Sequence, residues 1–149
     1  AYVNVHTAAN GGGEIRGQIG VTAAIRTTLS SRQEVPKPTG NVGRASGVFT
    51  GTVTRSGVTA RLGWRLTFAR LTGPAVAAHI HIGPRGRAGG VAVALCGPCR
   101  SGVRKQNVTL RRNVVAALEA GRAYVNVHTA GNPAGEIRGQ LAPVPLTVR

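Results

Sequence analysis

The chain carries nearly the same eighteen residues twice, and this repeat constrains its fold more than any other feature. Residues 1–18 read AYVNVHTAANGGGEIRGQ, and residues 123–140 read AYVNVHTAGNPAGEIRGQ. Only three of the eighteen positions differ, namely those of Ala9, Gly11 and Gly12. A match this close is an internal repeat, which has to be explained before a fold is assigned.

Each copy of the repeat predicts a β-hairpin. In the second copy Val125 and Val127 alternate with polar residues, as in a strand that buries one face. The segment GNPAG predicts a turn, after which GEIRGQL returns as a second strand. Because an isolated hairpin cannot bury its apolar face, each copy is expected to need further strands to pack against.

Most of the remaining chain also predicts strands. The segments RASGVFTGTVTRSG, VTARLGWRLTFARL, AAHIHIG and GVAVALC alternate in part and are separated by Gly and Pro turns. This spacing is typical of an antiparallel β-sandwich. In LRRNVVAALEAG, by contrast, Leu110, Val114 and Leu118 recur at helical spacing, and Gly121 can end a helix. The sequence predicts an all-β fold with one short helix near residues 110–120.

Three stretches of the chain together resemble the CHRD domain, the module named after chordin. They are TTLSSRQEVPKPTGNVGRASGVFTGTV, LTGPAVAAHIHIGPRGRAGGVAVAL and LEAGRAYVNVHTAGNPAGEIRGQL, and the resemblance runs from Ala24 to Pro143. It implies an immunoglobulin-like β-sandwich that is distantly similar to copper/zinc superoxide dismutase. It also implies a secreted or cell-surface protein. The family's biochemical role is poorly defined, so the resemblance predicts a fold better than an activity.

The resemblance makes the first copy of the hairpin surplus. Residues 24–143 would form a complete sandwich closed by the hairpin at 123–141, and residues 144–149 would form a tail. Residues 1–23 would then be the tail of a preceding domain, or strands accepted by the open edge of a neighbouring copy. The second arrangement would be a head-to-tail homopolymer, such as an extracellular filament. The residues expected to mediate this assembly are Tyr2, Val3, Val5, His6 and Ile15.

Three of the four histidines form the strongest candidate site. His79 and His81 lie two apart in AHIHIG, so both point to one face of a strand while Ile80 and Ile82 point to the core. His128 lies on the polar face of a later strand. Three imidazoles with an open position suit copper or zinc, so we predict a metal site, with copper favoured, on the outer face of one sheet. The alternative is that these histidines hydrogen-bond turns and cap the sheet.

Enzymatic activity is a further alternative. His-x-His on a strand followed by a later strand histidine is similar to the copper half of superoxide dismutase. However, the chain contains no Asp and so lacks that enzyme's Asp-containing zinc loop. It also contains no nucleophile elbow, P-loop or dinucleotide fingerprint. A structural or adhesive module is therefore favoured over a small copper redox enzyme.

The two cysteines lie in the sequence CGPC, as Cys96 and Cys99. Thioredoxin-type chemistry needs the first of them at a helix N-terminus. Here RSGVRKQ follows, and its Gly and Val oppose a helix. The motif therefore predicts a local disulfide, which suits an oxidising, extracellular setting.

A charged pair recurs in the returning strand of both hairpins. Glu136 and Arg138 are two apart, and Glu14 and Arg16 repeat them in the first copy. Residues two apart on a strand share a face. The spacing therefore predicts an ion pair that fixes each hairpin.

The chain is strongly basic, with 19 Lys and Arg against four Glu and a formal net charge of +15. One interpretation is a source organism that favours Arg. The other is a polyanionic partner such as nucleic acid, acidic polysaccharide or an anionic envelope. The basic residues are scattered and aromatic residues are few, which opposes a stacking platform. Loose adhesion to an acidic surface is the form of binding left open. No stretch is long and apolar enough to span a membrane.

Overall fold

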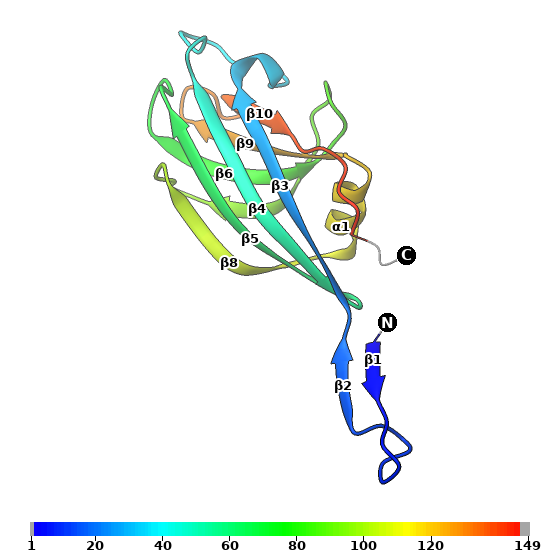
Figure 1. Ribbon diagram of the computed structural model, residues 1–149. Helices are drawn as coiled ribbons and strands as arrows, with labels where there is room; N and C mark the ends of the chain where they lie inside the picture. The colour runs from blue at the N-terminus through cyan, green and yellow to red at the C-terminus, as the bar shows by residue number, and fades with distance from the viewer. Residues whose placement is uncertain (1, 147–149) are drawn as a thin grey trace.

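The structure is a computed structural model and describes residues 2–146. Its strands form one eight-stranded antiparallel sheet that folds over on itself, and a separate two-stranded sheet (Figure 1). The predicted all-β sandwich with one short helix is confirmed. The strands of the large sheet are β3 (Gly20–Ser30), β4 (Ser46–Ser56), β5 (Thr59–Ala69), β6 (Ala75–Ile82), β7 (Gly90–Cys96), β8 (Val103–Leu110), β9 (Ala123–Thr129) and β10 (Ile137–Gln140).

The large sheet makes both layers of the sandwich. Its strand order is β7-β6-β9-β10-β3-β4-β5-β8, and in Figure 1 strands β3, β4, β5 and β8 lie in front of β6, β9 and β10. The layers are continuous at the junction of β10 and β3, where Arg138 pairs with Ser30. The 3₁₀ helix η1 (Ser31–Gln33) follows β3 directly at this junction.

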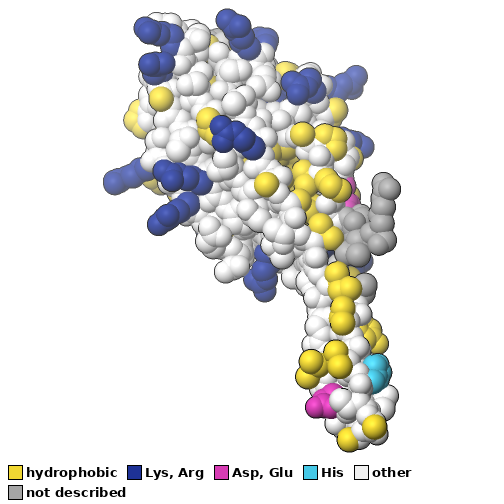
Figure 2. All heavy atoms as spheres, viewed as in Figure 1, with side chains coloured by type: hydrophobic (Ala, Val, Ile, Leu, Met, Phe, Trp, Pro, Cys, Tyr) yellow, Lys and Arg dark blue, Asp and Glu magenta, His cyan; other side chains and the backbone are white. Residues whose placement is uncertain are grey.

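Strand β5 shows how the sequence builds the core. Leu62, Trp64 and Leu66 are buried, whereas Arg61 just before them and Arg65 between Trp64 and Leu66 are exposed. This alternation is the period of two that places one side of a strand against the core. The same pattern places arginines on the outside, and Figure 2 shows Lys and Arg spread over the sandwich rather than gathered in one patch.

The helix α1 (Arg112–Glu119) covers one end of the core and leads the chain into β9. It buries Val114, Val115, Ala117 and Leu118. Gly121 follows it with a φ of +64°, and a Cβ there would lie 2.8 Å from Pro143 Cγ. Glycine is therefore the residue that fits this tight exit from the helix.

The hairpin made by β9 and β10 lies in the middle of the large sheet. Strand β9 pairs with β6 on one side and with β10 on the other, and all seven of its residues are buried. Removing this hairpin would divide the sheet and open the core. Its central position explains why the sandwich needs a hairpin here.

The first copy of the repeat forms the separate sheet, made by β1 (Tyr2–Val5) and β2 (Ile15–Gln18). In Figure 1 this N-terminal hairpin projects beyond the end of β3, away from the sandwich. Ile19 alone separates β2 from β3, and β3 runs through the boundary expected at residue 23. Among residues 2–146, five of the eight large exposed apolar side chains belong to this short segment. They are Tyr2, Val3, Val5, Ile15 and Ile19.

Candidate metal centre and the duplicated hairpin

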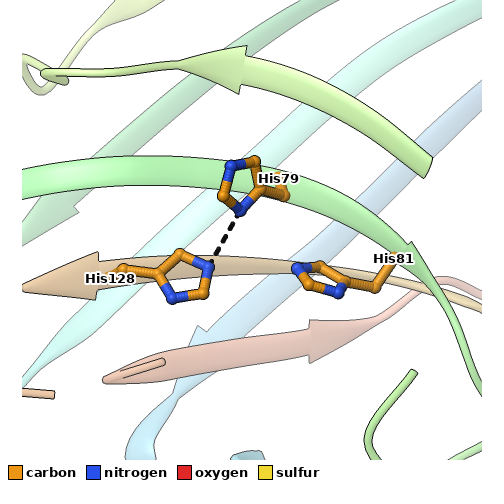
Figure 3. Close-up of side chains that lie close together, drawn as sticks. All are labelled: His79, His81 and His128. Atoms are coloured by element: carbon orange, nitrogen blue, oxygen red, sulfur yellow. Dashed lines mark hydrogen bonds between the residues drawn. The ribbon is translucent and has the colours of Figure 1, made fainter. Parts of the chain in front are cut away.

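The side chains of His79, His81 and His128 converge, as the sequence predicts. Their three potential ligand nitrogens all lie within 4.8 Å of one another. His79 and His81 come from β6 and His128 from the neighbouring β9, and Figure 3 shows the three rings facing one another. His79 Nδ1 lies 3.0 Å from His128 Nε2, which is the dashed contact in Figure 3.

Backbone carbonyls orient two of the three rings. His81 Nδ1 lies 2.8 Å from the carbonyl oxygen of Gly89, and His128 Nδ1 lies 2.9 Å from that of Pro133. A carbonyl oxygen only accepts hydrogen bonds, so each Nδ1 carries the proton. The Nε2 lone pair of each ring is then turned toward the cluster. Metal-ligating histidines are held in the same way by a partner on their other nitrogen.

One of these nitrogens has no hydrogen-bond partner. His81 Nε2 is buried and makes no hydrogen bond of good geometry to any of the described residues, although the Asn126 side chain lies near enough to affect the pKa of the ring. A buried polar atom left unpaired is costly unless it binds a ligand or water. Nitrogens at about 2.0 Å from a tetrahedral metal would be about 3.3 Å apart. Small ring rotations would therefore bring all three imidazoles onto one transition-metal ion.

The cluster lies on the side of β6 and β9 that faces away from the core, but it is not on an open surface. His81 and His128 are each 7% exposed, and His79 is half-buried. The sequence predicted an outer face, but it did not indicate that the loops after β6 and β9 would contact the rings. Burial lowers the pKa of all three imidazoles, and for His79 and His128 the neighbouring histidines lower it further. Neutral imidazole is the form that binds metals.

Two supporting side chains were not predicted from the sequence. The Tyr124 ring stacks on the His81 ring, with 4.9 Å between the ring centroids. The Arg138 guanidinium lies over the Tyr124 ring, 3.4 Å from its centroid. Arg138 is buried and donates to the carbonyls of Pro84 and Arg87. The alternation in AYVNVHT places Tyr124 on the same face as His128, and this is the only sequence pattern that could have indicated its role.

The structure does not form the ion pairs expected within the two hairpins. Glu136 accepts hydrogen bonds from Thr72, Thr129 and Asn132, and Arg138 donates to the carbonyls of a different loop. In the first copy Glu14 accepts from Thr7 and Asn10, and Arg16 lies over the Tyr2 ring. Among residues 2–146 the ion pair within 4 Å is that of Arg55 and Glu119. In both copies Thr and Asn of the hairpin's own turn bond to the Glu, and in the sandwich Thr72 from another loop joins them.

The predicted disulfide between Cys96 and Cys99 is present. It lies at the end of β7, and the backbone N–H of Cys99 donates to the carbonyl of Ala75 on the neighbouring β6. The chain then continues into β8 and not into a helix. The bridge therefore closes a loop of the sandwich and has no thioredoxin-like setting.

The two copies of the repeat fold in the same way. Both hairpins have the same register, so that Val5 faces Ile15 as Val127 faces Ile137. Their turns use the same side-chain hydrogen bonds. The matching pairs are Thr7 with Glu14 and Thr129 with Glu136, each at 2.6 Å; Asn10 with Glu14 and Asn132 with Glu136, each at 3.3 Å; and His6 with Gly11 and His128 with Pro133, each at 2.9 Å.

The two copies differ in what covers them. Val3 and Ile15 are 57% and 65% exposed, whereas their counterparts Val125 and Ile137 are fully buried. The first copy therefore has the conformation of a sandwich hairpin without a sandwich around it.

Comparison with known proteins adds a family match. The CHRD domain model matches residues 1–19 and residues 25–141, so the N-terminal hairpin and the sandwich are both covered. Searches of the curated proteins and of the solved structures found no match. Among the described residues, no helix has the length and apolar character needed to cross a membrane.

The Glu136 hydrogen bonds predict an acid-sensitive contribution to stability. Burial raises the pKa of Glu136, but hydrogen bonds from Thr129, Thr72 and Asn132 outweigh it and hold that pKa below its usual value. We expect Glu136→Gln to lower the free energy of unfolding by about 1–3 kcal/mol at pH 7. The lowered pKa means that this stabilisation is present above the unfolded-state pKa and is lost as the pH falls through the folded one.

Urea denaturation at pH 7 and at pH 3 to 4 measures this difference. The gap between wild type and Glu136→Gln should narrow in acid. Glu14→Gln is the matched control, because it alters the same turn in the exposed hairpin and should leave the midpoint unchanged. Equal effects of the two substitutions would show that the turn, and not its burial in the sandwich, matters.

Proposed function

The chain belongs to the CHRD domain family, and we propose that it is an extracellular structural module whose N-terminal hairpin closes a second sandwich of the same family. The observation that carries this proposal is the exposure of a complete closing hairpin at residues 2–18. A hairpin passed from one sandwich to the next is a head-to-tail contact, because donor and acceptor use different surfaces.

The polar contacts between the sandwich and its own hairpin support a sandwich of the same family as the partner of the N-terminal hairpin. Thr72 donates to Glu136, Thr39 N–H donates to Asn132, and the carbonyl of Pro84 accepts from Arg138. These three hairpin residues recur in the first copy as Glu14, Asn10 and Arg16. A sandwich lined like this one therefore offers partners to the polar side chains of the N-terminal hairpin as well as to its valines.

The hairpin cannot reach the closing position of its own sandwich. Arg138 pairs with Ser30 in antiparallel register, which places Gln140 beside Thr28. If the N-terminal hairpin docked there, Gln18 would lie beside Thr28. Thr28 is eight strand residues, or about 26 Å, from Gly20. Ile19 is the only residue between Gln18 and Gly20, and this link spans at most about 7 Å. The acceptor is therefore a different sandwich.

The acceptor must also have an empty closing position. The sandwich of each copy is already closed by its own β9–β10 hairpin, so a second copy would have to release one hairpin to accept another. Docking on a sandwich without a hairpin has no such cost. Burial of each Val or Ile side chain then contributes about 1.5–3 kcal/mol.

Complementation of a truncated sandwich tests the proposal. We expect residues 20–121, which lack the central hairpin, to aggregate alone because their core is open. Refolded with the full chain, this acceptor fragment should remain soluble as a one-to-one complex, measured by light scattering after size exclusion. The chain lacking residues 1–19 should give no rescue.

Point variants provide the matched controls. Replacing Val3, Val5 and Ile15 with Ser should abolish the complex, whereas replacing Val58, which is still more exposed, with Ser should not. Failure of the full chain to rescue the acceptor fragment would contradict the proposal. Large particles formed by the full chain alone and lost on deleting residues 1–19 would instead assign the acceptor to the open sheet edge of a second copy.

A second candidate function is copper binding at His79, His81 and His128. The unpaired Nε2 of His81 and the carbonyl-oriented rings favour it. Imidazole nitrogens suit copper, with zinc as the alternative ion. Copper would stabilise the packing of the hairpin on β6, since it would link side chains from both. A redox enzyme would in addition need a path for its substrate to the metal. The side of the cluster at His79, which is half-buried, is the most exposed.

Calorimetric titration with Cu²⁺ tests this candidate. Wild type and His6→Ala should each bind one equivalent, whereas the double variant His79→Ala, His81→Ala should lose it and keep its circular dichroism spectrum. One equivalent bound by the double variant would place the site elsewhere. A superoxide assay of the copper-loaded protein then tests the redox alternative.

A further inference from the structure

We propose that His6 is the third ligand of a metal site shared between two sandwiches. In this arrangement the N-terminal hairpin brings His6 to the position of His128, and the accepting sandwich supplies the residues equivalent to His79 and His81. The inference rests on the proposed function, and it adds that a transition-metal ion such as Cu²⁺ bridges the joint.

His6 already has the orientation of a ligand. Its Nδ1 lies 2.9 Å from the carbonyl oxygen of Gly11, as His128 Nδ1 lies 2.9 Å from that of Pro133. Because the carbonyl only accepts, the proton is on Nδ1 and the Nε2 lone pair is free to bind a metal. His6 is exposed, with no other histidine in its own hairpin.

The contact that orients this ligand belongs to the hairpin itself. Gly11 lies in the turn of the N-terminal hairpin, and Pro133 lies in the turn of the C-terminal one. Docking therefore requires nothing from the acceptor to orient His6. The identical register of the two hairpins then fixes where His6 arrives.

The pairing of β9 with β6 defines that position. His128 lies opposite Ala77, two residues before His79 and four before His81. A hairpin bound in this register would place His6 opposite the residue equivalent to Ala77. Its Nε2 would then face the two acceptor imidazoles, as His128 Nε2 faces His79 at 3.0 Å. The set has two nitrogens from one sandwich and one from the other.

A shared metal links two equilibria. An ion bound only when donor and acceptor are together stabilises the joined state in proportion to its concentration over its dissociation constant. The metal would thus act on the assembly itself. A metal held wholly within one sandwich would stabilise that sandwich and leave the joint unaffected.

The full-length variant His128→Ala separates these cases. Its own closing hairpin lacks the third ligand, whereas its N-terminal hairpin still carries His6. When this variant is refolded with one equivalent of Cu²⁺, its N-terminal and C-terminal hairpins compete for the closing position of each sandwich. We expect Cu²⁺ to favour hairpins donated by neighbouring copies, so that the average mass by light scattering at least doubles from 15.3 kDa. Chelation with EDTA should reverse the increase.

Three controls make the result specific to His6. Wild type refolded with Cu²⁺ should stay near the mass of one chain, since its own hairpin completes the site. The double variant His6→Ala, His128→Ala should show no copper-dependent increase. His128→Gln should behave as His128→Ala does, which provides a second variant if the alanine destabilises the fold.

Two results would overturn the inference. One is a mass of His128→Ala and His128→Gln that does not change with Cu²⁺; the other is an equal increase in the double variant. If the full chain nevertheless rescues the acceptor fragment without metal, hairpin docking stands and only the shared metal site is wrong. If that rescue also fails, the proposed joining of sandwiches is wrong as well.

Discussion

The pairing of the β9–β10 hairpin between β6 and β3 is the interaction on which the sandwich depends. It joins the two layers, and its valines complete the core. A sandwich without it would expose both the core and the free edges of β6 and β3, and unpaired edges of this kind are templates for association. A chain that presents a second, unburied copy of the same hairpin therefore carries the part that such a sandwich needs.

The same interaction builds the histidine cluster. His79 and His81 belong to the body of the sandwich, and His128 belongs to the hairpin. A metal ion at this position would hold the hairpin in place as well as occupy a site. The presence of His6 in the N-terminal hairpin, with the same carbonyl contact, gives that hairpin the means to form an equivalent site elsewhere. If the cluster binds a metal, closing the sandwich with a hairpin also completes the metal site.

Local patterns in the sequence were enough to predict the strands other than β3 and β8, the helix and the meeting of the histidines. The alternation in β5 and the His-x-His spacing each depend on the period of a strand. The burial of the histidines and the contact of Glu136 with Thr72 were beyond such patterns, because both depend on how loops pack in the folded chain. Thr72, for example, is 64 residues from Glu136, and no local spacing indicates that they meet. The expected ion pairs are absent from both hairpins because Thr and Asn of the hairpin's own turn bond to each Glu.

The most direct test of the account is amide hydrogen exchange at residues 2–18, followed in the free chain and in its complex with the acceptor fragment. An isolated two-stranded hairpin is marginally stable in water, so these amides should exchange rapidly in the free chain. In the complex the amides of Val3, Val5 and Ile15 should become as protected as those of Val125, Val127 and Ile137. Residues 2–18 that exchange equally fast in both states would contradict the claim that this hairpin closes a second sandwich.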